Sequence, residues 1–263
     1  MKTMLEAYEW AKETGWRFIK HLADNNYYVA KAYYRLCLNP SNSRDQEPLI
    51  VYQMGKVGSM TVIKSLKAAK STKASGLDMP IYHVHALTYG AMRDMERFFK
   101  RRFKASAHRR CTSDHLVHSQ ELHRQAIMGL RHVWTCRYLR RQIDDGPKGK
   151  RWKVVTLVRD PIARNISSFF HLLNYDLEYK AKFAEAGAFA GGMELFLEEY
   201  DQHEEPLTWY DSELKSVFGI DVFSSDFPQL KGYEIYEGEQ ADVLLLKVER
   251  LNECVHDAFK KFL

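Results

Sequence analysis

Long apolar runs are missing from this sequence. No stretch approaches the roughly 18 to 20 consecutive apolar residues that a membrane-spanning helix needs. The beginning does not resemble a signal peptide either, because Glu6, Glu9 and Glu13 stand where such a peptide has its apolar core. We therefore expect no transmembrane segment and a cytoplasmic location.

Cysteine motifs are missing as well. The four cysteines (Cys37, Cys111, Cys136 and Cys254) form no CxxC pair and no Cys/His spacing typical of a metal site. We interpret them as free thiols in a reducing compartment, and we expect no metal. What the chain does have is 45% hydrophobic and 28% charged residues, which is ordinary for a globular protein with a full core.

Acidic residues are scarce between residues 97 and 141. Asp114 and Glu121 are the acidic residues there, against Arg97, Lys100, Arg101, Arg102, Lys104, Arg109, Arg110, Arg124, Arg131, Arg137, Arg140 and Arg141. Such a surface favours an anionic partner, although a solvated helical surface explains it equally well. Few aromatic residues alternate with these charges, so we do not expect a nucleic acid.

Strands and helices alternate after a turn-rich connector that ends near residue 48. Apolar runs predict strands at 48–53, 81–87, 153–158 and 242–248, and a shorter one near 233–236. Helical spacing predicts helices at 1–37, 59–70, 159–173, 192–204, 211–218 and 251–263, with most of 89–141 helical. The alternation predicts an α/β fold, a P-loop-like three-layer sandwich with a mainly parallel sheet.

Two regions follow from this pattern. Residues 1–44 form an N-terminal helical extension, and residues 45–263 form the α/β domain. The sequence stops inside an amphipathic helix, so we expect a C-terminal piece to be missing.

The segment "YQMGKVGSMT" (52–61) places a glycine loop between a strand and a helix. Such a loop directs successive backbone N–H groups at one point, where the helix dipole adds positive charge. Gly55 and Gly58 permit close approach, Lys56 adds a full charge, and Ser59 and Thr61 offer hydroxyl groups. The loop therefore predicts an anion site, the alternative being a plain turn.

The order of residues in this loop disfavours a nucleotide-triphosphate P-loop. In that motif the lysine follows the last glycine, whereas Lys56 precedes Gly58. The buried strand at 153–158 ends in Arg159 rather than in an aspartate suited to magnesium, which indicates a second anion rather than a metal. A P-loop kinase or NTPase stays the first alternative.

At this point a family resemblance emerges. "YQMGKVGSMT" and "LVRDPIARNISSFF" resemble the two donor-binding segments of the sulfotransferases that use 3′-phosphoadenosine-5′-phosphosulfate (PAPS). "YHVHALT" (82–88) is similar to the His-x-His strand of uronyl 2-O-sulfotransferases. "PLTWYDSELKSVFGIDVFSS" and "LLLKVERLNE" resemble bacterial capsular polysaccharide synthesis proteins of the sulfotransferase type. The resemblance covers roughly residues 48–260.

The resemblance implies a role for each matched residue. Lys56 would contact the 5′-phosphate and the bridging oxygen to the sulfuryl group, and further donors to that phosphate would come from Gly58, Ser59, Met60 and Thr61. Arg159 and Ser167 would bind the 3′-phosphate, with Ser168 as a rival for the serine. Arginine suits this task because its planar fork donates two parallel bonds. Arg164 could be either a ligand or a solvated side chain.

His83 and His85 alternate along one predicted strand, so both point to the same face. The resemblance points to His85 as the base that takes the proton of the attacking hydroxyl, with His83 assisting or binding the acceptor. Packed core histidines are the alternative. Trp209, Tyr210 and Asp211 resemble a tryptophan-containing motif of the capsular group, to which we assign no chemistry. We interpret its aromatic residues as part of the core.

We therefore predict a sulfotransferase that moves a sulfuryl group from PAPS to a carbohydrate hydroxyl by in-line displacement. A capsular or extracellular polysaccharide, including an acidic one, is the candidate acceptor. The second alternative is a non-catalytic anion-binding module of polysaccharide assembly. The glycine-rich C-terminal loop common in soluble sulfotransferases is absent from the chain, so the adenine site has no sequence candidate.

Overall fold

The computed structural model describes residues 15–24, 26–38, 48–71, 79–109, 116–146, 151–173, 177–187 and 190–263. The chain divides into two compact units. A helical unit contains residues 1–44 and 89–141, and an α/β unit contains residues 45–88 and 142–263. The helical segment 89–141 thus interrupts the α/β unit in sequence.

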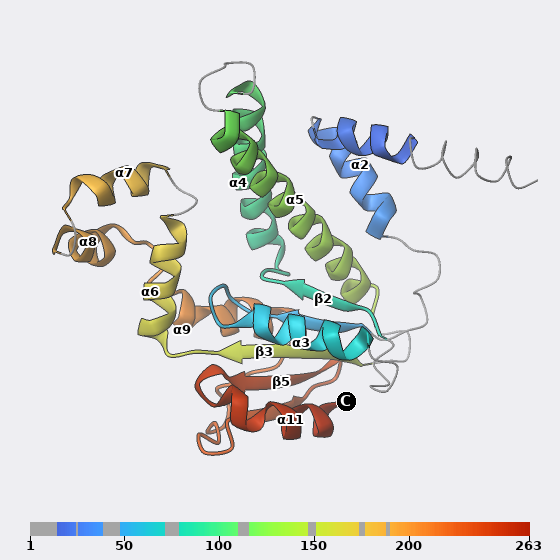
Figure 1. The fold of residues 1–263 in the computed structure, drawn as a ribbon. Helices are drawn as coiled ribbons and strands as arrows, with labels where there is room; N and C mark the ends of the chain where they lie inside the picture. Colours follow the sequence, from blue (N-terminus) through green and yellow to red (C-terminus); the bar gives the residue numbers. More distant parts are fainter. Residues whose placement is uncertain are drawn as a thin grey trace, which may run out of the picture. The chain divides into compact units, whose positions relative to one another are not determined.

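A five-stranded sheet forms the centre of the α/β unit (Figure 1). Its strands lie in the order β2-β1-β3-β5-β4. The first four of these are parallel, and β4 pairs antiparallel with β5 at the edge. Their bounds are β1 Leu49–Tyr52, β2 Ile81–Val84, β3 Trp152–Val158, β4 Tyr233–Glu237 and β5 Ala241–Lys247. The predicted α/β class with a mainly parallel sheet is confirmed, whereas the P-loop-like sandwich remains a prediction.

The continuous apolar runs became the buried strands, as expected for a parallel sheet. All four residues of β1 are buried, and so are six of the seven residues of β5. The strand predicted at 81–87 ends earlier, at Val84. Beyond it the backbone N–H groups of Leu87 and Thr88 turn to the carboxylate of Glu213 instead of a neighbouring strand.

Helices connect these strands. Those of the α/β unit are α3 Ser59–Ser71, α6 Pro161–Leu172, α7 Leu177–Glu185, α8 Ala190–Glu194, α9 Glu205–Trp209, α10 Ser216–Phe218 and α11 Leu251–Phe262. Two π-helical segments, Leu195–Glu199 and Tyr210–Lys215, interrupt the helices predicted at 192–204 and 211–218. Helix α7 was not predicted.

Helix α6 begins as its sequence predicts. The Asp160 side chain accepts a hydrogen bond of 2.8 Å from the backbone N–H of Ala163, which satisfies one of the unpaired donors of the first turn. Pro161 occupies the first helical position, where its missing N–H costs nothing. The helix therefore starts directly after β3 and fixes the direction in which residues 159–171 leave the sheet.

The helical unit is built on aromatic packing. It contains the helical residues 15–24, α2 Tyr27–Leu38, α4 Tyr89–Arg109 and most of α5 Leu116–Asp144. Its core includes Tyr27, Tyr34, Phe103, Leu130 and Trp134, with the rings of Tyr34 and Trp134 stacked at 5.5 Å. In the part of the chain that the structure describes, every helix is too short or too polar to cross a bilayer.

Candidate functional site

Three segments meet at one edge of the sheet. Parallel strands present their carboxyl ends at the same edge, and ligands of open α/β sheets bind there. Strand β1 lies between β2 and β3, so the segments that follow these strands become neighbours. They are the glycine loop 53–59, the turn 85–88 and the start of α6 at 159–161. This is the set of segments that carries most of the sequence-predicted site residues.

The glycine loop contains two residues in the left-handed backbone region. Lys56 has φ +71° and Gly58 has φ +80°. A Cβ at Gly58 would lie 3.5 Å from the Val248 side chain, an ordinary contact, so the backbone angle rather than space requires glycine. Lys56 is the one non-glycine residue with positive φ in the described segments. A left-handed lysine costs about 1–2 kcal/mol, and strain of this kind gathers at functional sites.

Two arginines from the β3–α6 junction bind the backbone of this loop. Nη1 of Arg159 donates to the carbonyl oxygen of Lys56 at 3.1 Å. Nε of Arg164 donates to the carbonyl oxygen of Gly55 at 3.1 Å. Successive loop carbonyls are thus held by guanidinium groups, and Arg159 is brought to Lys56 from 103 positions away in sequence.

Arg164 is a buried structural residue. Its side chain is 2% exposed and pairs with the carboxylate of Glu205. It also donates to Oδ1 of Asn165 at 3.0 Å and to the hydroxyl of Tyr200 at 3.3 Å. The alternative that Arg164 is solvated is therefore wrong, and its donors are used inside the protein to hold the loop.

The cation cluster consists of Lys56 and Arg159, and the imidazole of His171 lies close enough to feel the charge of Lys56. Burial and the neighbouring guanidinium of Arg159 lower the pKa of Lys56. Burial and the charge of Lys56 also lower the pKa of His171, at the end of α6. Like charges held together in this way are stabilised by an anion placed among them. Sequence reasoning missed His171, although it follows Ser167 by one helical turn.

The other predicted donor-site residues differ in how far they are buried. Ser59 is buried at the first position of α3, whereas the side chains of Met60 and Thr61 are exposed. Ser167 is half-buried on α6. Its rival Ser168 is buried, with its hydroxyl 3.4 Å from the Gln202 side chain. Contacts of these residues with a donor molecule stay predictions.

The two predicted histidines lie side by side where β2 ends. The rings of His83 and His85 are 4.5 Å apart and nearly perpendicular. Nδ1 of His85 is 2.8 Å from the carbonyl oxygen of Gln53, at the start of the glycine loop. A carbonyl can only accept, so Nδ1 carries the ring proton and Nε2 carries the basic lone pair.

Both imidazoles favour the neutral form. Burial and the neighbouring imidazole of His85 lower the pKa of His83 to about 4. Burial also lowers the pKa of His85, opposed by the bond to Gln53 and by the charge of Glu205. A neutral imidazole at physiological pH is the form that can accept a proton.

Glu213 fixes the turn that follows these histidines, and sequence reasoning missed it. Its buried carboxylate accepts hydrogen bonds from the backbone N–H groups of Leu87 (2.8 Å) and Thr88 (3.1 Å) and from the hydroxyls of Thr88 and Tyr52. Trp209 donates from Nε1 to the carbonyl oxygen of His85 at 3.2 Å. Trp209 and Tyr210 are buried, which confirms the interpretation of this motif as core aromatics.

Comparison with known proteins gives one partial match. Residues 193–263 are similar to a family described as "Putative capsular polysaccharide synthesis protein". The match contains Trp209, Glu213 and strand β5, and it excludes the glycine loop and the histidines. Searches of curated proteins and of solved structures returned no match.

Proposed function

We propose that this protein is a sulfotransferase that moves a sulfuryl group from PAPS to a hydroxyl of a carbohydrate. The observation that carries the proposal is the contact between the two predicted anion-binding segments, with Arg159 donating to the Lys56 carbonyl at 3.1 Å. A donor with phosphate groups on two positions of its ribose needs cationic side chains from neighbouring segments, and Lys56 and Arg159 belong to such segments. The partial match to a capsular polysaccharide synthesis family supports a carbohydrate as the acceptor.

The residues of the cluster would share the charge of the donor. Lys56 and the amino end of α3 receive the 5′-phosphate, where negative charge builds as the bridging S–O bond breaks. Arg159 and Ser167 receive the 3′-phosphate. The two guanidinium bonds to loop carbonyls keep the loop in place during the reaction, so the stabilising groups need not reorganise.

His85 is the proposed base. The acceptor oxygen attacks sulfur in line with the leaving oxygen, its proton passes to Nε2 of His85, and 3′,5′-ADP leaves with the electron pair of the broken S–O bond. The bond from Nδ1 to Gln53 supports this role because it fixes the tautomer that can accept the proton. His83, 4.5 Å away, packs against the ring of His85 and restricts its orientation.

A thermal shift with 3′,5′-ADP tests the donor site. Ligand at 100 times its Kd should stabilise the folded state by about 2.7 kcal/mol, or about 5–10 °C in Tm for a chain of this size. Lys56→Ala should remove most of the shift. Lys64→Ala is the matched control, because Lys64 is an exposed lysine of the same helix-loop segment.

Other results would contradict the proposal in identifiable ways. An equal shift in Lys56→Ala and in the wild type would exclude the donor site. Displacement of 3′,5′-ADP by ATP with Mg²⁺ would favour the kinase alternative. Sulfuryl transfer unchanged in His85→Ala would exclude that histidine as the base.

A further inference from the structure

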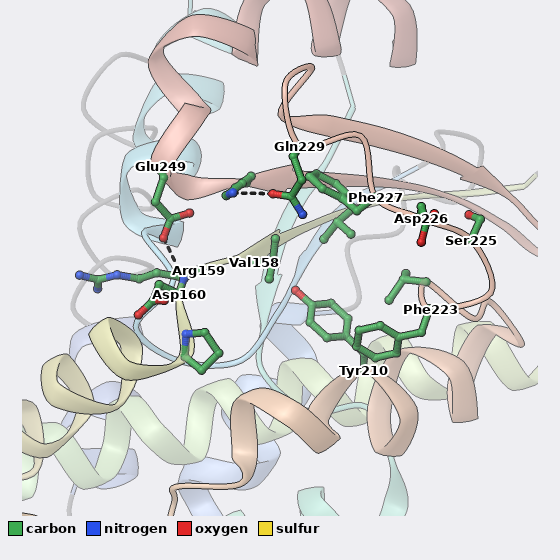
Figure 2. A pocket seen from close by; sticks show the side chains of 14 residues that line it. Val158, Arg159, Asp160, Tyr210, Phe223, Ser225, Asp226, Phe227, Gln229 and Glu249 are labelled. Carbon is green, nitrogen blue, oxygen red and sulfur yellow. Dashed lines mark hydrogen bonds between the residues drawn. The ribbon is translucent and has the colours of Figure 1, made fainter.

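A cavity opens at the carboxyl ends of β3 and β5, beside the cation cluster. Its volume is about 670 Å³, within the range of about 300–1,000 Å³ typical of small-molecule pockets. Val158 and Arg159 line it from β3, and Lys247 and Glu249 line it from the end of β5. The opposite wall is the loop that precedes β4, with Phe223, Phe227 and Gln229 (Figure 2).

The loop that precedes β4 carries one exposed aromatic ring at the pocket. The Phe223 side chain is 61% exposed, although its ring stands at 5.8 Å and 88° to the buried ring of Tyr210. Its backbone N–H donates to the Asp221 carboxylate at 2.9 Å, and that carboxylate also binds Lys215 at 2.6 Å. The hydroxyl of Tyr236 donates to the carbonyl oxygen of Val222. The backbone that carries this large apolar ring is therefore held in place, while the ring itself packs beside Tyr210 and faces solvent.

The charge of this pocket differs from that of the cation cluster. Three carboxylates (Asp160, Asp226 and Glu249) line it, against the basic residues Arg159 and Lys247. Figure 2 shows the Arg159 side chain extending away from the aromatic side chains of the pocket. The ammonium of Lys247 donates to Oε1 of Gln229 at 2.6 Å, which leaves the amide nitrogen of Gln229 as a donor. A phosphate or sulfate is disfavoured here.

We infer that this pocket binds an uncharged sugar ring of the carbohydrate acceptor. The aromatic face of Phe223 packs against the C–H groups of the ring, and the Asp226 carboxylate and the Gln229 amide bind its hydroxyls. Asp160 caps α6, and Glu249 accepts a hydrogen bond of 2.8 Å from the backbone N–H of Asp160, so these two carboxylates shape the pocket wall. Most of the lining residues, from Tyr210 to Glu249, lie within the segment matched by the polysaccharide-synthesis family. The inference deepens the proposed function and rests on it only for the identification of the sugar as the acceptor.

Saturation-transfer NMR on the full chain tests the pocket. The probes are methyl β-glucopyranoside, methyl β-galactopyranoside and N,N′-diacetylchitobiose, with glucose 6-sulfate as the charged counterpart. We expect saturation transfer to at least one neutral probe and at least fivefold less to the sulfated sugar. Phe223→Ala and Gln229→Ala should each reduce the neutral signal at least fivefold. Phe170→Ala, which removes another exposed ring of the same unit, should leave it unchanged.

The outcomes separate this inference from the proposed function. No transfer to any neutral probe, or a signal equal in Phe223→Ala and the wild type, overturns the sugar pocket. Loss of the 3′,5′-ADP thermal shift in Phe223→Ala means that the pocket holds the nucleoside, which overturns the inference and keeps the proposed function. Sugar binding without any thermal shift by 3′,5′-ADP would support the sugar pocket and contradict the proposed sulfotransferase activity.

Discussion

At the scale of single residues, the histidine pair shows how a common residue type acquires a particular proton affinity. Both rings lie where backbone and side chains exclude water, so the charged form loses hydration and the pKa of each imidazole falls. The carbonyl of Gln53 then selects the tautomer of His85. Burial thus favours the neutral imidazole, and the bond to Gln53 decides which ring nitrogen carries the proton.

The pKa direction of His85 predicts the pH dependence of the reaction. Because the base must be unprotonated, kcat/KM should hold as the pH falls through 6.5 and should decline only below that value. Rates of sulfuryl transfer to a carbohydrate acceptor across pH 4.5–8 measure this acid side of the pH profile. A half-maximal rate above pH 6.5 would contradict the assignment.

Folding stability needs a separate measurement over the same range. The pKa of His83 is about 4 in the folded protein, against about 6.5 in an unfolded chain. Between these values the unfolded chain binds more protons, so stability is full above pH 6.5 and falls as the pH drops towards 4. Urea unfolding at each pH, with His83→Asn as the control, separates this loss from the titration of His85.

At the scale of elements, the glycine loop combines strain and charge at one lysine. The sequence pattern predicted the strand, the loop and helix α3 almost to the residue. It could not predict the left-handed Lys56, because the loop carbonyls are held by Arg159 and Arg164, which are distant in sequence. Local sequence specifies the loop, and distant residues specify its shape.

Two substitutions in this loop should change stability in opposite directions. Lys56→Gly relieves a left-handed strain of about 1–2 kcal/mol and adds about 0.5–1 kcal/mol of unfolded-state entropy, so stability should be unchanged or up to about 1.5 kcal/mol higher. Gly58→Ala adds a left-handed strain of about 1–2 kcal/mol and removes about 0.5–1 kcal/mol of unfolded-state entropy, so stability should be unchanged or up to about 1.5 kcal/mol lower. Denaturant unfolding measures both.

The Lys56→Gly variant also separates the effect of backbone strain on stability from the effect of the lysine on anion binding. Lys56→Gly should lose the thermal shift with 3′,5′-ADP although its fold is at least as stable as the wild type. A variant that keeps the shift would show that the lysine ammonium does not bind the anion.

The sequence could predict those features that depend on residues close together in the chain. The strands at 49–52, 152–158 and 241–247 and the start of α6 follow from apolar runs and from Asp160-Pro161, which act within a few residues. The roles of Arg164 and Glu213 depend on Glu205 and on Leu87, at separations of 41 and 126 residues. No spacing rule reaches across such distances, so these residues became visible only in the fold.

At the scale of the whole molecule, the positive charge is concentrated in one segment of the sequence, although the net charge of the chain is modest. The chain carries a net charge of +5, while residues 97–141 hold twelve basic side chains against two acidic ones. In the structure part of this charge is used internally: Arg137 pairs with Glu96, and the Arg131 guanidinium lies 4.6 Å above the ring of Tyr34. Exposed residues of α4, such as Arg101 and Lys104, remain on the surface.

This surface should bind an acidic glycan in a salt-dependent manner. Retention on immobilised heparin should fall steeply with added salt, because each contact releases counterions and screening shortens the range of attraction. Arg101→Glu with Lys104→Glu should elute at lower salt than the wild type. The control pair Lys64→Glu with Lys70→Glu reverses two exposed charges on α3. Equal elution of both pairs would assign retention to net charge alone.

The guanidinium bonds that hold the glycine loop also order events during protein synthesis. The ribosome releases Lys56 long before Arg159, Arg164 and Glu205, so the nascent chain has the lysine but not the side chains that shape its backbone. A chain arrested before residue 159 leaves the loop without its clamps. The loop therefore reaches its final shape late in translation, and a product truncated before residue 159 lacks the guanidinium bonds that hold the loop carbonyls.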